Sequence, residues 1–343
     1  GSGTGPIDAP DDAWTFVEFP GALCMNGEST GIGINPHPTS DDVLIFMMGG
    51  NACFNLASCS VTAHRDGYGA EEFAEELVSI IQARPYFDRS NPDNPFRDFS
   101  YVFVPYCTGD VHSGDKADVQ VGGQTRQFKG FSNMGQYLER VVPTFPNAGR
   151  VVLAGESAGG FGAAMNYDQV ASAFGAAVRT TLIDDCGPPM AEAYIPACLQ
   201  AHFHATWGTR DNLPSDCAGC ADEAFLEPYV EYLLGKYPDR SLALISSASD
   251  ATIRQFLGFG ENDCASINGA PQPYDPAKYE EGLVDLRDRV ADSGRFRLYL
   301  VPGEEHVFFD NGFGGVEVNG VALEDWIAQA IAEDANWANV SAP

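Results

Sequence analysis

The sequence predicts an α/β fold in which a mostly parallel central sheet is flanked by helices. Short, continuously apolar runs alternate along the chain with segments of helical periodicity. The length of 343 residues and the 44% hydrophobic content suit one large domain. We therefore expect a single domain over residues 11–343, with residues 1–10 as a linker or cloning remnant.

Apolar runs bounded by turn residues predict the strands of the sheet. The clearest run covers residues 42–48, DVLIFMM, and ends at a glycine pair. Such uninterrupted runs are typical of strands that are covered on both faces. Comparable runs predict strands at residues 14–24, 100–105, 150–154, 179–185, 241–247 and 296–301.

Helical periodicity predicts the layers that cover the sheet. In residues 71–84 the side chains of Phe73, Leu77, Ile80 and Ile81 fall on one face of a helix. Similar spacing predicts helices at residues 133–142, 161–174, 279–293 and 322–332. Residues 85–97 are rich in Pro and Asn and predict a loop.

The charge balance excludes some classes of partner. The chain has 48 acidic and 19 basic residues, a formal net charge of -29. Nucleic acids are disfavoured because phosphate binding needs Lys and Arg patches, and an anionic membrane surface is disfavoured for the same reason. No stretch is apolar enough for a membrane span. Acidic surfaces keep proteins soluble in saline habitats, which we treat as a hypothesis. The sequence does not indicate an oligomeric state.

Nine cysteines predict a secreted or extracytoplasmic protein with several disulfides, whose native leader is absent from this chain. The odd number leaves at least one thiol without a partner in the chain. Residues 190–226 mix short helical pieces with three cysteines, and we interpret residues 190–230 as a disulfide-containing cap inserted into the domain. Cys186 and Cys264 could staple this cap to the core, although spacing does not determine pairing.

Two short motifs could hold a metal ion. Cys217 and Cys220 form a CxxC motif with His202 and His204 nearby, but no second ligand pair follows at zinc spacing, so a disulfide is favoured. Residues 110–115, DVHSGD, alternate Asp and His, which more often indicates a hydrogen-bonded turn. This loop follows a predicted strand and could line the rim of a site. We expect no metal and no cofactor.

The segment 151–160, VVLAGESAGG, is the most informative stretch of the chain. An apolar strand runs into Gly-x-Ser-x-Gly and then into a small-residue helix start. This is the nucleophile elbow of an α/β-hydrolase fold, in which a sharp turn exposes the serine hydroxyl to a histidine base. The segment predicts Ser157 as the nucleophile. The alternative is an ordinary turn with a buried serine.

Chain order predicts the partners of Ser157, since this fold runs nucleophile, acid, base. His306 is the only histidine in the last third of the chain and follows the strand 296–301. Asp250 follows the strand 241–247, the usual position of the acid. Asp185, at the end of the strand 179–185, is the second candidate for the acid.

Ester hydrolysis also needs backbone N–H groups that bind the oxyanion. The N–H of Ala158, directly after the nucleophile, is one expected donor. The loop Gly49-Gly50-Asn51-Ala52 follows an early strand and is expected to supply another, because glycines let the backbone approach the substrate. The alternative for this loop is a plain turn.

Three motifs together resemble the pectin acetylesterase/Notum family. Residues 49–59, GGNACFN followed by a cysteine, resemble its GGWxCxN…C signature, residues 106–110 (YCTGD) resemble a strand end of that family, and residues 155–160 (GESAGG) match its nucleophile motif. The matched segments run from about Cys24 to His306. The resemblance implies carboxylester hydrolysis without a cofactor, most often removal of an acyl group from a polysaccharide or protein.

The resemblance also implies roles for individual residues. It implies that Ser157, Asp250 and His306 form the catalytic triad. The oxyanion donors that it implies are Gly50, Asn51 and Ala158. It further implies the disulfides Cys53–Cys59 and Cys24–Cys107. Asn51 departs from the family pattern, which usually has Trp there, and implies a more open or more polar site.

We interpret the chain as a secreted serine carboxylesterase that deacetylates acetylated polysaccharide through an acyl-enzyme. An esterase for longer acyl esters or polyesters is one alternative, and an inactive binding or scaffold protein on the same fold is another. Phe308, Phe309 and Phe313 could wall an acyl subsite, although we expect them to pack in the core.

Overall fold

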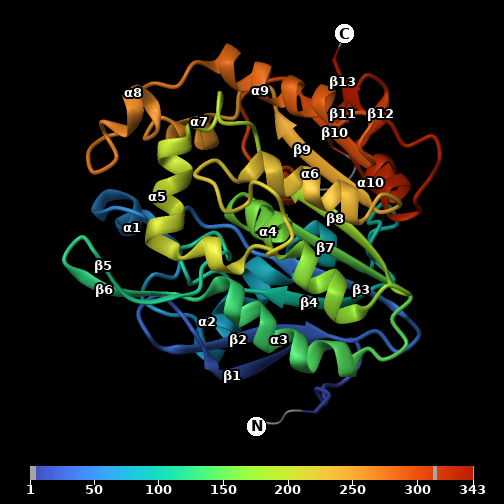
Figure 1. Cartoon of the computed structure of the whole chain (residues 1–343). Coiled ribbons are helices and arrows are strands. Elements are labelled where there is room, and N and C mark those ends of the chain that lie inside the picture. The colour runs from blue at the N-terminus through green and yellow to red at the C-terminus, as the bar shows by residue number, and fades with distance from the viewer. Residues whose placement is uncertain (1–4, 312–314, 343) are drawn as a thin grey trace.

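The computed structural model describes residues 5–311 and 315–342, and within these ranges its main sheet has nine strands (Figure 1). In spatial order they are β1 (Thr15–Leu23), β2 (Ser29–Asn35), β4 (Ser100–Val104), β3 (Asp42–Met47), β7 (Arg150–Glu156), β8 (Arg179–Asp185), β9 (Ser241–Ser247), β10 (Arg295–Val301) and β13 (Val340–Ser341). The β1–β2 and β2–β4 pairs are antiparallel, and all the other pairs are parallel. The predicted mostly parallel sheet is thus confirmed.

Alternation along the strands divides the core into two layers. In β3, Val43, Ile45 and Met47 pack into one buried cluster, while Leu44 and Phe46 pack into the other. This follows from the two-residue period of a strand, and it explains why β3 is apolar at every position after Asp42.

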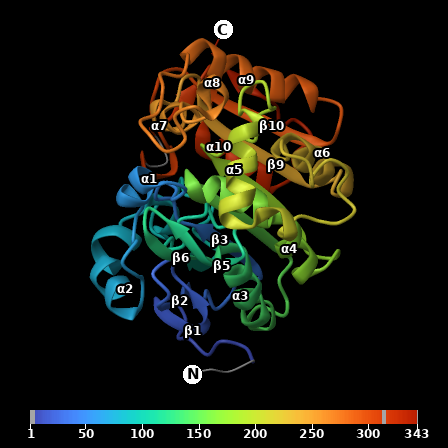
Figure 2. The ribbon, with the colours of Figure 1, turned by 60° about the vertical axis from the view of Figure 1, so that its left-hand side comes forward.

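Helices cover both faces of the sheet (Figures 1 and 2). The first face packs against α3 (Gly130–Thr144), α4 (Ala158–Phe174), α6 (Leu226–Lys236) and α9 (Pro276–Arg289). The second packs against α2 (Ala70–Glu76), the turns η1 (Leu77–Ile81) and η2 (Pro85–Phe87), and α10 (Leu323–Ile331). The helix predicted over residues 71–84 is shorter than expected. It ends at Glu76, and the backbone continues from Leu77 as the wider π-helical turn η1.

Smaller elements complete the fold. They are the hairpin β5 (Lys116–Val121) and β6 (Gln124–Phe128), the pair β11 (Glu317–Val318) and β12 (Val321–Ala322), the helices α1 (Leu56–Val61), α5 (Ala197–Trp207), α7 (Ala251–Leu257) and α8 (Glu261–Cys264), and the turns η3 (Thr209–Asn212) and η4 (Phe309–Asn311). Figure 1 shows α1, α5 and α7 grouped at one end of the sheet. The candidate site lies at this end.

All nine cysteines lie in the described residues, and eight of them form disulfides. The bonds are Cys24–Cys107, Cys53–Cys59, Cys198–Cys264 and Cys217–Cys220. The first two confirm the pairs that the resemblance implied. Cys264 links the cap segment to the rest of the domain as expected, through Cys198. The link expected from Cys186 is wrong, because Cys186 stays free and buried.

The zinc alternative for the CxxC motif is excluded by its disulfide, which uses both sulfur atoms. His204 is buried and its Nδ1 pairs with Thr209 Oγ1, while His202 Nε2 lies 3.0 Å from the carbonyl oxygen of Phe54. Both imidazoles therefore support the local packing.

Part of the expected linker packs against the domain. Ile7 is buried and its N–H donates to Thr144 Oγ1 at 2.7 Å. Phe308 and Phe309 are buried in the second layer, as expected, and Phe313 lies outside the described residues.

Across residues 5–311 and 315–342, none of the helices combines the length and the apolar character needed to cross a bilayer.

Candidate active site

Ser157 lies in a sharp turn between β7 and α4. Its backbone has φ 56° and ψ -120°, a region that non-glycine residues rarely adopt, and such conformations concentrate at functional sites. The motif glycines are required by close packing: a Cβ at Gly155 would lie 2.0 Å from the carbonyl oxygen of Gly159, and a Cβ at Gly159 would lie 2.0 Å from that of Met47. The local sequence therefore produces the strand–turn–helix geometry of a nucleophile elbow.

The loop after β3 lies directly against this elbow. A Cβ at Gly49 would meet Ser157 Cβ at 3.0 Å, and Gly50 has φ +153° with Tyr106 and Ala63 packed against it. Asn51 has φ 68°, and its Nδ2 donates to the carbonyl oxygen of Val61 at 2.9 Å.

Asn51, Ser157 and Ala158 line one pocket. Ala158 is the first residue of α4, so its N–H is one that the helix itself does not use.

Asp250 and His306 form a pair on neighbouring loops. His306 Nδ1 lies 2.7 Å from Asp250 Oδ2, and Asp250 Oδ1 accepts the N–H of Ile253 at 2.9 Å, which caps α7. The Asp250 carboxylate is fully buried. The pairing follows from the sheet, because β9 and β10 are adjacent, parallel and in register up to Ser247 and Val301, so the loops that follow them meet.

Asp185, the second candidate for the acid, has a different set of contacts. Its Oδ2 accepts the N–H groups of Phe308 and Phe309 at 2.7 and 2.9 Å, just after His306. Its carbonyl oxygen accepts the N–H of Ser157 at 2.7 Å. Burial raises the pKa of Asp185 to about 6, and the two N–H donors oppose that rise. Asp185 therefore joins the elbow to the His306 loop.

The sequence did not predict the ion network beside the elbow, in which Arg84 and Glu156 are buried and Asp310 is exposed. Arg84 Nη1 lies 2.7 Å from Glu156 Oε1, 2.7 Å from the Tyr86 hydroxyl and 2.5 Å from Asp310 Oδ1. Burial raises the pKa of Glu156 to about 8, although the charge of Arg84 opposes this. The only sequence signal was the acidic residue inside the Gly-x-Ser motif, since nothing local marks Arg84 as its partner.

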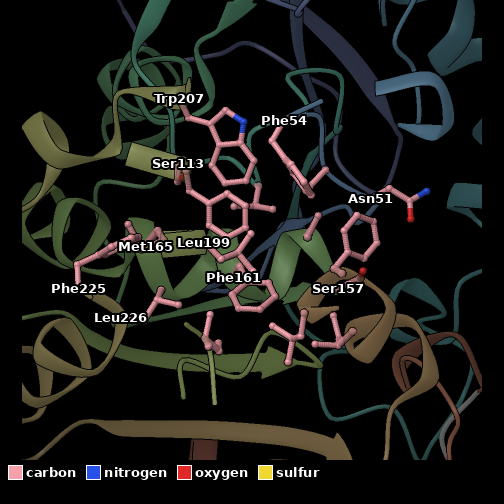
Figure 3. A pocket seen from close by; sticks show the side chains of 18 residues that line it. Asn51, Phe54, Ser113, Ser157, Phe161, Met165, Leu199, Trp207, Phe225 and Leu226 are labelled. Atoms are coloured by element: carbon pink, nitrogen blue, oxygen red, sulfur yellow. The ribbon is translucent and has the colours of Figure 1, made fainter. Parts of the chain in front are cut away.

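An apolar pocket opens beside Ser157. Its cavity volume is about 80 Å³. Its walls come mainly from α4, α5 and α7, and Figure 3 shows Ser157 and Asn51 on one side with Met165, Phe225 and Leu226 on the opposite side. The apolar lining residues are Ala52, Phe54, Val111, Ala158, Phe161, Met165, Ile195, Leu199, Phe203, Trp207, Phe225, Leu226, Ile253, Phe256 and Leu257. Only Asn51, Ser113 and Ser157 bring polar side chains.

The loop 110–115 forms a hydrogen-bonded turn at this pocket. The buried Asp110 carboxylate accepts bonds from Thr108 Oγ1 and from the N–H groups of Gly114 and Gly130. His112 Nε2 lies 2.9 Å from the carbonyl oxygen of Met48, and burial lowers the pKa of His112 to about 4. The side chains of Asp110 and His112 are thus used in packing, while Asp115 is exposed and pairs with Lys129.

Comparisons with known proteins bear on the family and the fold of this chain. The sequence model of the pectinacetylesterase family matches residues 12–238. The palmitoleoyl-protein carboxylesterase notum2 of Xenopus laevis is 29% identical over 159 residues, which cover 46% of this chain and 32% of that protein. Human NOTUM is 27% identical over 157 residues, covering 43% and 29%. The chain thus matches about a third of the length of these curated relatives.

A solved structure of the Wnt deacylase Notum from Drosophila shares the fold. It superposes with a TM-score of 0.62 at 16% identity, covering 93% of this chain and 92% of that one. The α/β-hydrolase fold is therefore confirmed. Because the family model matches more than half of the residues, the chain belongs to the pectinacetylesterase family of carboxylic ester hydrolases.

Proposed function

We propose that this protein is a serine carboxylesterase with Ser157 as nucleophile, His306 as base and Asp250 as the residue that orients the base. Ser157 Oγ attacks the ester carbonyl while His306 takes the hydroxyl proton at Nε2. The Asp250 carboxylate holds the proton on Nδ1 and stabilises the imidazolium. The elbow conformation of Ser157 and the 2.7 Å contact between Asp250 and His306 support these roles.

The tetrahedral oxyanion accepts bonds from backbone N–H groups of Gly50, Asn51 and Ala158. Each such donor is worth on the order of 3 kcal/mol in the transition state. His306 then gives its proton to the leaving alcohol. Water, activated by the same histidine, releases the acid from Ser157. The packing of Gly49 against Ser157 supports this arrangement, because it holds the loop next to the reacting carbonyl.

The apolar pocket at Ser157 is the observation that favours an acyl chain longer than acetyl. An acetyl group would occupy only its mouth, whereas each further methylene that enters the pocket contributes about 0.8 kcal/mol, or roughly fourfold in kcat/KM. The names of the curated relatives, palmitoleoyl-protein carboxylesterases, point the same way. Deacetylation of polysaccharide stays a prediction, and the longer-acyl alternative is the better supported.

Residues 190–230 act as the cap of this pocket in our proposal. Leu199, Phe203, Trp207, Phe225 and Leu226 all lie in that segment and supply much of the apolar wall. The Cys198–Cys264 and Cys217–Cys220 disulfides tie the segment to α8 and to itself. Together with the other two disulfides, they support an extracytoplasmic location.

The charge of the chain bears on the alcohol part of the substrate. Pectin carries carboxylates, and a protein with a formal net charge of -29 repels polyanions, most strongly at low salt. We therefore propose that the alcohol part is neutral or cationic, such as a neutral polysaccharide or a basic protein segment.

A series of p-nitrophenyl esters from acetate to decanoate tests the acyl proposal, with acetylated xylan and acetylated pectin assayed beside it. We expect kcat/KM to rise with chain length and then level off. Acetate as the best substrate would contradict the longer-acyl proposal without affecting the nucleophile. Ser157→Ala should abolish turnover and labelling by a fluorophosphonate probe, and wild-type protein that fails to label would favour the inactive scaffold.

A further inference from the structure

Cys186 is the one cysteine outside the disulfides among the described residues, and it lies beside the Asp250–His306 pair. The Cys186 sulfur, a carboxylate oxygen of Asp250 and a ring nitrogen of His306 all lie within 4.8 Å of one another. In the part of the chain that the structure describes, no other trio of His, Cys, Asp or Glu side chains comes this close. The pair is explained by the proposed hydrolysis, but the thiol is not.

These three groups are a donor set for a borderline-soft divalent cation. Zinc binds thiolate, imidazole and carboxylate at roughly 2.0–2.3 Å, so the donor atoms around one tetrahedral ion are about 3.5 Å apart. To reach that spacing, Asp250 Oδ2 and His306 Nδ1, now 2.7 Å apart, must separate by about 0.8 Å, and the distances to the sulfur, at most 4.8 Å, must shorten by up to about 1.3 Å. Calcium and magnesium prefer oxygen ligands alone, so the thiol selects against them.

Asp185 gives a second observation at the same place. Its Oδ1 is buried and lacks a hydrogen bond of ordinary distance and angle within the described residues. The Cys186 thiol lies against the same carboxylate, and a backbone N–H of Val307 reaches the sulfur. The Asp185 carboxylate therefore lies against the sulfur without being one of the three mutually close donors, and the sulfur is already held against the His306 loop.

We propose that Cys186, Asp250 and His306 bind Zn²⁺, or a cation of similar softness, and that binding inhibits hydrolysis. The ion bonds to the Cys186 sulfur, Asp250 Oδ2 and His306 Nδ1, the nitrogen that faces Asp250. The thiol releases its proton to solvent as the ion binds, and the thiolate and carboxylate together balance the two positive charges.

The inhibition follows from the tautomer of His306. A neutral imidazole has one nitrogen with a proton and one with a lone pair. When the metal takes the lone pair of Nδ1, the proton must sit on Nε2. Nε2 is then a donor and cannot accept the Ser157 proton. The ion thus blocks the base without filling the acyl pocket.

Burial sets the kinetics of binding. Cys186 and Asp250 have no exposed surface, whereas the His306 side chain is 19% exposed. The ion must therefore enter past the imidazole ring while the His306 loop opens. We expect slow-onset inhibition that chelation reverses slowly.

Two assays test the proposal. In the first, wild-type protein is preincubated with ZnCl₂, assayed on p-nitrophenyl butyrate and then treated with EDTA. We expect time-dependent, EDTA-reversible inhibition. Cys186→Ser and Cys186→Ala should keep basal activity and raise the half-inhibitory zinc concentration on the order of 100-fold. Equal inhibition of wild type and both variants, or no inhibition of wild type, would overturn the proposal.

In the second assay, Co²⁺ is titrated into Ser157→Ala protein and the near-ultraviolet absorbance is recorded. Cobalt bound to a thiolate gives a charge-transfer band, and Cys186 is the only thiol that can supply it. We expect the band in Ser157→Ala protein and its loss in the Ser157→Ala/Cys186→Ser double variant. Absence of the band in the first protein, or its persistence in the second, would refute the site. Because Ser157→Ala protein is inactive under the proposed function, this outcome is independent of hydrolysis.

Discussion

The Arg84 guanidinium lies 2.7 Å from the Glu156 carboxylate, one residue before Ser157 in the chain. Both side chains are buried, and Arg84 also contacts Asp310 beyond the His306 loop. One cation therefore joins the region around η2, the elbow and the segment that follows the proposed base. The first two predictions concern this pair.

Removing the positive charge of Arg84 should destabilise the fold strongly above about pH 8, where Glu156 is ionised. Under that condition Arg84→Met leaves the Glu156 carboxylate without its buried partner, and breaking such a pair costs about 3–5 kcal/mol. Glu156→Gln should cost only about 1 kcal/mol, since the amide oxygen still accepts the bond from Arg84. Chemical denaturation of both variants measures the difference. Equal losses would contradict the view that the unpaired charge dominates.

The raised pKa of Glu156 predicts a pH dependence of stability. Burial moves it from an ordinary 4.5 to about 8 in the folded chain. The folded state therefore binds more protons than the unfolded state between these values, and the free energy of unfolding falls as pH rises from about 5 to 8. Melting temperatures across this range check the sign. Glu156→Gln should flatten the profile, and an unchanged slope in that variant would assign the effect to other groups.

Asp185 should position His306 through the backbone N–H groups of Phe308 and Phe309, which its carboxylate binds. Asp185→Ala leaves the N–H groups of Phe308 and Phe309 without their acceptor, each at about 1–3 kcal/mol, and frees the loop that carries His306. We expect kcat to fall at least about tenfold with little change in KM. Asp185→Asn retains an acceptor oxygen and is the matched control. A KM effect without loss of kcat would exclude a positioning role.

The wall opposite Ser157 should set the acyl-length optimum. Leu226→Trp extends the side chain into the pocket, so we expect kcat/KM to fall on the order of tenfold for the longer esters and to stay unchanged for acetate. Leu226→Ala is the control and should extend the optimum to longer chains. The same p-nitrophenyl series measures both variants. An equal loss on every ester would mean that the substitution disturbs the fold instead.

Local pattern predicted most strands of the sheet, the edge strand β1 included, but it missed β2 and β13. β3, β8 and β9 are buried at nearly every position because helices cover both faces, and in β3 this burial is visible in the sequence as an apolar run. β2 is glycine-rich and β13 has two residues, so neither carries a comparable pattern. The helix over residues 71–84 was predicted at its start, but its change to a π-helical turn at Leu77 depends on packing against the sheet.

The sequence alone determined the elbow at Ser157 and the order of its candidate partners, because a strand, a tight turn and a helix are encoded within ten residues. The tertiary structure decided which carboxylate meets His306. Asp185 and Asp250 both follow apolar strands, and only the adjacency of β9 and β10 brings Asp250 to the imidazole while Asp185 binds the backbone beyond it. It also decided the lining of the pocket and the position of Cys186, since these side chains come from segments far apart in the chain. Their proximity arises from packing, which no local pattern records.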